Sequence, residues 1–458
     1  MIKTIFAIFS VIISLTMLAC TADTGGSTNP ANTSDEVDSI QSSATAADRA
    51  PPFWTNEHRD VLQLVNGLLL EPEVESAKQK IIEMYSNSPS GSIADGEATL
   101  ESAVDSLMYG ALLASASKNL ADAKIVWSET LAYDYAGVEV PDNRYAGETP
   151  DRIYRNVVLS SDYRYELHGK YDAEINQDFS VEVIPGPANW GLPPLAVLRA
   201  KNIILEADGS FKITLDADPA GDRVNNLQLT AKAKGLLIRD TVGDWALNKP
   251  VTISLVSLDA DKGVDLTKQE IVDRAVGTLQ DAVRVSLMFY GGIWKRELNQ
   301  LTTYVRDLGW GIVGLNRFSI ADDEALVVTI DSLGAEYFGI QVDDLWLRSV
   351  DYYQYASTMN LKQSRANPDG SYTYVISSKD PGHINWIDTG GLNDGYLVAR
   401  WELFPQITDG SGAVKSVQKV KLSELKGALA EASVFVSHKE RAQLLNDRRN
   451  KLNLRMGK

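Results

Sequence analysis

The chain has 458 residues and a formal net charge of −17, from 61 acidic and 44 basic residues. Nucleic acid is bound by basic patches, so this balance argues against a nucleic-acid partner. It also argues against docking on anionic lipid through surface charge. The single cysteine, Cys20, excludes an internal disulfide. The remaining length is too great for one ordinary core, so two or three domains are expected.

The first residues have the pattern of an export signal. Lys3 precedes an apolar run that ends at Leu18. At about 15 residues this run is too short to span a bilayer, which takes roughly 20. The sequence 16–20 resembles a lipobox, in which the cysteine takes a diacylglycerol, so we expect lipidation at Cys20 and a membrane partner through that anchor. The alternative is an ordinary signal peptide with a cysteine near its end. Thr21 after the cysteine favours the outer membrane, by resemblance to Gram-negative sorting rules.

Three patterns follow in chain order. Residues 20–50 are rich in Ser, Thr, Gly, Asn, Ala and Asp, which is typical of a disordered tether. Apolar residues then recur at helical spacing through residues 60–114. Alternating, β-rich runs occupy residues 125–258.

The second half repeats this order. Thr267 and Glu270 have the spacing of a capping box, and they begin an amphipathic helix that we expect to end near Gly291. Strand patterns return from residue 325 to about 404, and residues 422–456 read as helix.

The two β-rich regions share a weak internal echo. Its features are an Asp-Gly turn that begins a strand, a later Asn and then an Arg, at Asp208, Asn226 and Arg239 in the first region and at Asp369, Asn385 and Arg400 in the second. Two related modules would explain this echo, and chance similarity of hairpins stays open. The expected class is α+β, with two β-sandwich-like modules, each preceded by helices, and a helical C-terminal tail. The expected divisions are a signal peptide (1–19), a tether (20–50), a helical region (51–122), a first β module (123–260), a helical linker (261–310), a second β module (311–410) and the tail (411–458).

Several of these segments resemble a known bacterial family. The block 380–391, Asp-Pro-Gly-His-Ile-Asn-Trp-Ile-Asp-Thr-Gly-Gly, is the most specific of them. The segments 148–155, 235–245 and 337–363 also match, although Glu148 stands where the family pattern has Asn, and His383 lies one position earlier than in some relatives. Residues 120–410 therefore resemble proteins that carry the domain of unknown function catalogued as twelve-fourteen. The resemblance implies a β-sandwich fold with helical additions and no settled activity.

The block 380–391 is the first candidate ligand site. His383, Asn385, Trp386 and Asp388 surround a rigid aromatic with polar groups, as loops that grip a sugar or another ring do. The structural alternative is that Asp388 caps backbone amides, Trp386 fills a core and Asn385 satisfies buried carbonyls.

Other polar residues lie in or beside β-rich runs. Arg155, Arg239 and Arg400 either pair with carboxylates or recognise an anionic ligand, and pairing is the default in an acidic chain. Arg400 and Asp388 are a plausible pair. Asn316 lies beside aromatic residues, as Asn360 does, and we consider that both line a cleft between the modules.

No recognised catalytic or metal-binding motif is present. The four histidines, His58, His168, His383 and His438, are far apart and form no zinc motif, so neither a metal nor a cofactor is expected. We therefore favour an envelope protein that binds a small molecule, glycan or lipid between the modules. The alternative is a carboxylate-based hydrolase or lyase of glycans or lipid-like substrates, with His383 and Asp388 as acid and base. A purely structural partner of another envelope protein stays open.

Overall fold

The computed structural model describes residues 55–135, 137–186, 193–306, 310–405 and 409–456. The expected signal peptide, the expected tether and Cys20 lie outside these ranges. Within them, no helix combines the length and the apolar character that crossing a bilayer requires.

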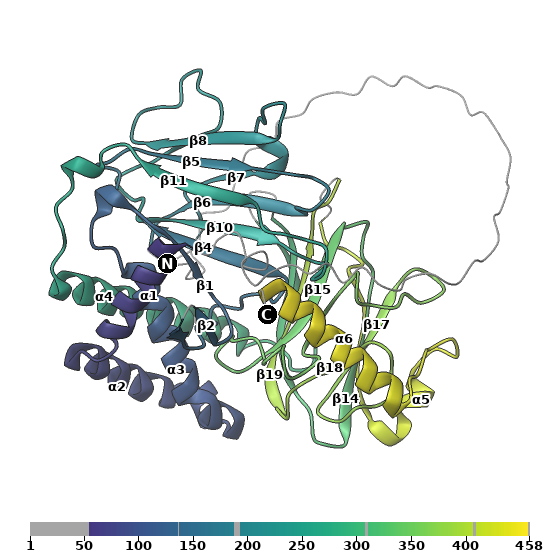
Figure 1. Ribbon diagram of the computed structural model, residues 1–458. Helices are drawn as coiled ribbons and strands as arrows, with labels where there is room; N and C mark the ends of the chain where they lie inside the picture. The colour runs from purple at the N-terminus through teal and green to yellow at the C-terminus, as the bar shows by residue number, and fades with distance from the viewer. Residues whose placement is uncertain (1–54, 136, 187–192, 307–309, 406–408, 457–458) are drawn as a thin grey trace, which may run out of the picture. The chain divides into compact units, whose positions relative to one another are not determined.

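The helices fall into an N-terminal group with α4, and a C-terminal pair (Figure 1). Thr55 caps the first helix, and the expected capping box of Thr267 and Glu270 begins α4, which ends at Ile293, close to the expected Gly291. The apolar faces of α1 to α4 share one core. The helices are α1 (Asn56–Leu68), α2 (Pro72–Ser86), α3 (Ala94–Ser115), α4 (Lys268–Ile293), α5 (Leu425–Ala428) and α6 (His438–Met456).

The first β region is a sandwich of two sheets. We name β1-β4-β10-β6-β7 the first inner sheet and β11-β5-β8-β9 the first outer sheet. Their facing apolar residues form one core. The strands are β1 (Ile125–Ser128), β4 (Arg152–Val158), β5 (Tyr165–Lys170), β6 (Asp178–Ile184), β7 (Ala196–Arg199), β8 (Ser210–Asp216), β9 (Asn226–Gln228), β10 (Gly235–Thr241) and β11 (Thr252–Ser257), beside a ribbon of β2 (Tyr133–Tyr135) and β3 (Val138–Val140).

The second β region is a sandwich of the same kind. Its inner sheet is β12-β13-β19-β15-β16, and its outer sheet is β18-β17-β14-β20. The strands are β12 (Thr303–Arg306), β13 (Gly311–Ser319), β14 (Glu324–Ile330), β15 (Tyr337–Asp343), β16 (Thr358–Asn360), β17 (Tyr372–Ser377), β18 (Trp386–Asp388), β19 (Asp394–Glu402) and β20 (Val414–Lys421).

The two sandwiches have the same topology, strand for strand. The inner-sheet orders match from β1 and β12 onward, and each outer sheet ends in a parallel pair, β8–β9 and β17–β18. Arg239 lies in β10 and Arg400 in the equivalent β19. The expectation of two related modules is therefore confirmed, and the weak echo marks equivalent strands.

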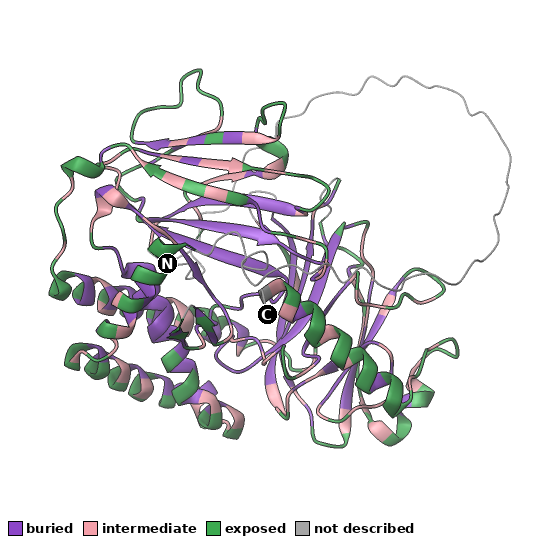
Figure 2. Cartoon of the chain, viewed as in Figure 1, coloured by how far each residue is buried: buried purple, intermediate pink, exposed green. Residues whose placement is uncertain are grey.

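The central strands of the inner sheets are buried on both faces, unlike β5 and β11 of the first outer sheet (Figure 2). Every residue of β4, β6, β10 and β15 is buried, whereas β11 alternates between exposed and half-buried positions. One face of each inner sheet packs in its own sandwich core. The other face lies against the opposite module and the helices.

A buried carboxylate joins the two modules. Asp151, just before β4, is fully buried and accepts hydrogen bonds from Trp245 Nε1 at 2.8 Å, Tyr337 Oη at 2.9 Å and Asn360 Nδ2 at 2.9 Å. Burial raises the pKa of Asp151, and these three donors oppose the rise. Asn360 thus lies between the modules, as expected, but as an internal contact.

Two strands fall where the sequence predicted helix or linker. The strand β12 lies in the expected linker 261–310, and β20 lies in the expected helical tail 411–458. Both are edge strands of their sheets. Edge strands are short or carry charged residues, as β20 does with its lysines, and this masks the usual apolar alternation.

Candidate ligand-binding site

A cavity of about 600 Å³ lies between the inner sheets and the helices. This volume falls within the roughly 300–1,000 Å³ of small-molecule sites. Its walls come from α3, α4, both inner sheets and the segment 144–148 that precedes β4. We call it the intermodule cavity. It has a charged end and an apolar end.

The charged end is built around Trp310, which precedes β13. The guanidinium carbons of Arg239, Arg306 and Arg152 lie 5.0, 5.4 and 5.9 Å from the centroid of its ring. Cation–π attraction holds such groups over an indole face. Arg400 also lines the cavity, from β19 of the second inner sheet.

These four arginines are not matched by an equal number of carboxylates. Arg152 pairs with Glu402, and Arg239 pairs with Glu182. Arg306 Nη1 lies 3.8 Å from the already paired Glu402. No described carboxylate forms an ion pair with Arg400.

Arg400 is held by neutral oxygens instead. Its Nη1 donates to Gln341 Oε1 at 3.1 Å, and its Nη2 donates to the carbonyl of Gly147. Arg239 pairs with Ser180 of β6, and Arg400 pairs with Gly339 of β15. Two residues further along these strands lie Glu182 and Gln341, which therefore occupy equivalent positions. The first module therefore neutralises its arginine with a carboxylate, whereas the second module places a neutral amide at the same position.

Several buried donors at this end have no acceptor. Nε of Arg152, Nε of Arg239 and Nε1 of Trp310 are buried without a hydrogen-bond partner among the described residues. Buried N–H groups are nearly always satisfied, so such groups call for an acceptor.

Burial shifts three further carboxyl groups near the cavity toward their neutral form. Burial raises the pKa of Glu129 to about 8, against the attraction of Arg239, and burial raises the pKa of Asp343 to about 7. Burial and the neighbouring Asp343 raise the pKa of Glu148 well above its usual range. Burial, with repulsion from Arg239, lowers the pKa of Arg306 to about 10. The site therefore carries an excess of positive charge at neutral pH.

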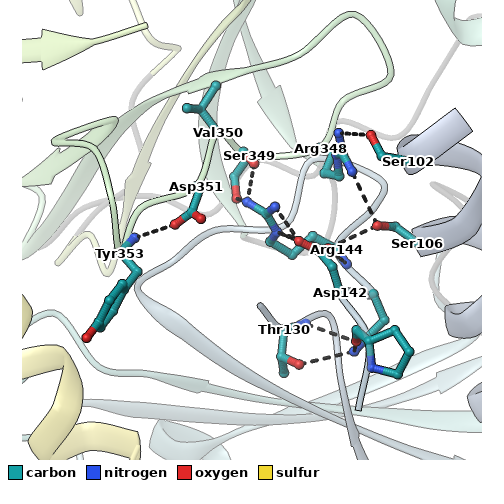
Figure 3. A network of polar contacts seen from close by, with 12 residues as sticks. Ser102, Ser106, Thr130, Asp142, Arg144, Arg348, Ser349, Val350, Asp351 and Tyr353 are labelled. Carbon is teal, nitrogen blue, oxygen red and sulfur yellow. Dashed lines mark hydrogen bonds and ion pairs between the residues drawn. The ribbon is translucent and has the colours of Figure 1, made fainter. Parts of the chain in front are cut away.

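A polar network fixes another wall of the cavity (Figure 3). The guanidinium of Arg144 lies between the carboxylate of Asp142 and the carbonyl of Ser349. Arg348 donates from its own loop to Ser102 of α3 at 2.9 Å. These contacts join the helices, the first module and the second module at this wall.

The apolar end follows from the register of the second inner sheet. Residues paired on adjacent strands share one face of a sheet. Val398 pairs with Leu315, and two residues further along Arg400 pairs with Val313. Side chains on this face therefore change from aliphatic to charged over roughly 7 Å, the span of two residues. Tyr290 of α4 packs against these aliphatic residues.

Of the candidate residues from the sequence, Arg400 lines the intermodule cavity. The expected Arg400–Asp388 pair is wrong. Asp388 lies in β18 of the second outer sheet, and Arg400 lies on the far face of the inner sheet. Asp388 accepts from the backbone N–H of Gly390 at 2.9 Å, and burial raises its pKa to about 6.

The block 380–391 uses its side chains internally. Asn385 Nδ2 donates to the carbonyls of Arg365 and Thr373, at 2.7 and 3.0 Å. Trp386 is buried and donates to the carbonyl of Ser377 at 3.1 Å, and His383 is buried with its ring edge-on to Phe435. These contacts fit the structural alternative, and none of the four candidates in this block is among the described residues that line the cavity.

Arg155 and Asn316 are also placed elsewhere. Arg155 points into the first sandwich, where it pairs with Asp240 and donates to the carbonyl of Val251 at 3.0 Å. Asn316 Nδ2 donates to the carbonyl of Glu297 at 2.7 Å. Neither lines the intermodule cavity, so the expectation that Asn316 lines a cleft between the modules is wrong.

Four residues that line the cavity were not expected from the sequence: Glu129, Arg152, Arg306 and Trp310. The echo offered a signal, because it aligned Arg239 with Arg400, and both line the cavity. In the described ranges, no group of three or more His, Cys, Asp or Glu residues is placed to hold a metal ion.

The chain is similar to solved structures in fold. An uncharacterized protein from Burkholderia cenocepacia is 19% identical, with a TM-score of 0.60, over 77% of this chain and 95% of that one. A protein from Vibrio parahaemolyticus is 11% identical, with a TM-score of 0.40, over 60% of this chain and 90% of that one. No family model and no curated protein matches, so the resemblance to the domain of unknown function stays a prediction. The first similarity shows that the α+β arrangement described here is an established fold.

Proposed function

We propose that the protein binds a small anionic molecule in the intermodule cavity. The observation that carries the proposal is the excess of guanidinium charge beside buried donors that have no acceptor. Arg400 has no ion pair among the described residues, and Arg306 shares, at 3.8 Å, a carboxylate that already pairs with Arg152. Keeping buried cations without counterions costs stability, and an anion that accepts their hydrogen bonds would repay that cost.

Thermal shift with carboxylates, phosphates and matched neutral compounds tests this proposal. Anions should raise the melting temperature and neutral analogues should not. Arg400→Gln and Arg306→Gln should each weaken the response, and Arg284→Gln, on the exposed side of α4, is the matched control. A response that is equal for charged and neutral compounds would contradict the proposal.

We further propose that this binding takes place at the cell envelope, with Cys20 as the lipid anchor. The signal-like start and the single cysteine support this setting. Mass spectrometry of the mature N-terminus from native cells should find a lipid-modified Cys20. An intact N-terminus in the cytosol would contradict the proposal.

A carboxylate-based hydrolase or lyase is the second candidate, and Glu129 is the residue that favours it. A buried carboxyl with a pKa of about 8 holds its proton at neutral pH, as a general acid must. The test is turnover of glycan and ester libraries. Activity lost in Glu129→Gln, with ligand binding intact, would favour the enzyme, and binding without turnover would favour the binding protein.

A further inference from the structure

We infer that the ligand is a single-chain amphiphile, with one acyl-type chain and an anionic head. This inference rests on the proposed function and names the chemical class that the same cavity accepts. The anionic head lies at the charged end, and the chain lies along the aliphatic rows beneath α4.

The segregation of the cavity wall supports an amphiphile. On the second inner sheet, Leu315 and Val398 form an aliphatic row, Val313 and Arg400 form the next, and Arg306 begins the charged end. The apolar end is therefore a surface of core quality that faces an open volume. Each methylene of a ligand buried there contributes roughly 0.8 kcal/mol. A glycan would leave this surface without an apolar partner.

The helix α4 closes the apolar end. Val285, Phe289 and Tyr290 line the cavity from its C-terminal half, with Leu107 opposite them on α3. Ser286, between them on α4, also lines the cavity. The helices thus present mainly hydrocarbon and aromatic rings to the space in which a chain would lie.

The rim of the cavity is apolar and exposed. Phe289 and Tyr304 line the cavity and expose 41% and 40% of their surface. Exposed apolar groups gathered at the mouth of a cavity mark a site that takes up apolar molecules. An amphiphile can enter with its chain in contact with these residues throughout.

The size of the cavity limits the ligand to one chain. A volume of about 600 Å³ holds one drug-sized molecule and is smaller than a phospholipid with two acyl chains. A fatty acid and a monoacyl phosphate share the required chemistry. Their heads differ in charge and in acceptor number, so binding measurements distinguish them.

The experiment is isothermal titration of the full-length chain carrying Cys20→Ser. The probes are laurate, lauryl phosphate, lauryl alcohol and butyrate, so chain and head are varied separately. We expect laurate or lauryl phosphate to bind at least about tenfold more tightly than lauryl alcohol and butyrate, and the tighter of the two identifies the head.

Variants locate the two halves of the ligand. Val285→Trp fills the apolar end. It should weaken the binding of laurate by about tenfold or more and leave the binding of butyrate unchanged. Arg400→Gln should weaken every anionic probe, and Arg306→Gln gives the same test without breaking the contact to Gly147. Met288→Trp and Arg284→Gln are the controls, because Met288 is 80% exposed and the Arg284 side chain is 67% exposed, both on α4. Both controls should bind as the wild type does.

Two outcomes would overturn the inference in distinguishable ways. If butyrate binds as tightly as laurate and Val285→Trp has no effect, the cavity has no site for an acyl chain. The proposed binding of a small anion then stands. If no anion binds, whatever its chain, the proposed function fails together with the inference.

Discussion

Replacing Arg306 should stabilise the free protein, which is the reverse of the usual effect of removing a buried charge. Burial and repulsion from neighbouring arginines lower its pKa well below the ordinary value of an arginine, to about 10. The unfolded chain therefore holds this proton more tightly, and the charged group costs the folded state at pH 7.

The size of the effect follows from that pKa. The fall of the Arg306 pKa to about 10 corresponds to at most about 3–4 kcal/mol. The side chain is 28% exposed, so solvent screens part of this cost, and about 1–2 kcal/mol is expected. Arg306→Gln should therefore raise the free energy of unfolding by that amount while weakening anion binding.

Arg152 provides the contrast. It lies on the same indole but pairs with the buried Glu402. Arg152→Gln removes the nearer of the two guanidinium groups that face Glu402 and leaves only Arg306, at 3.8 Å. Breaking a buried pair costs about 3–5 kcal/mol. Urea unfolding followed by tryptophan fluorescence measures both variants. If Arg306→Gln destabilises the protein by more than about 1 kcal/mol, the account of an incompletely neutralised cation held ready for a ligand is refuted.

Three further changes test other parts of the structure. Asp151→Ala removes the acceptor of three buried donors between the modules and should cost about 3–5 kcal/mol in urea unfolding; a loss below about 1 kcal/mol would show that this contact does not hold the modules together. Burial lowers the pKa of His58 to about 4, so the unfolded state binds its proton first and stability falls with pH below about 6.5. Between pH 7 and 5 the loss should be about 2 kcal/mol, and it should be absent in His58→Leu; an equal loss in both proteins would assign it to other groups. Thr267→Ala removes half of a capping box and should cost about 1 kcal/mol, whereas Lys268→Ala, one residue on, should be near neutral.

Local signals in the sequence predicted the helices well. The beginning of α4 depends on hydrogen bonds within one turn, and Thr267 and Glu270 carry them wherever the helix packs. The Asp-Gly turns before β8 and β17 are local in the same way. They made the internal echo visible before the matching topology was known.

The site could not be read from the sequence because its sheets are buried on both faces. In β4 the alternation of apolar and polar residues is lost, so nothing local indicated that Arg152 faces the other module while Arg155 faces the sandwich core. The choice of Arg155 was wrong for this reason. The strongest motif, 380–391, reflects internal contacts of the second sandwich.

The negative net charge of the chain does not indicate the charge of the cavity. A charge of −17 describes the whole chain, whereas the cavity gathers arginines from β4, β10, β12 and β19. These residues meet through the packing of two modules that are far apart in the sequence. Bulk charge therefore argues against nucleic acid and gives no information about the cavity.

The most direct test of the central claim is a crystal structure of the protein purified from its native cells. We predict density for one bound molecule between the two inner sheets, with its acidic group within hydrogen-bonding distance of Arg306 or Arg400. Density for a ligand at the block 380–391, with only water between the inner sheets, would contradict the account.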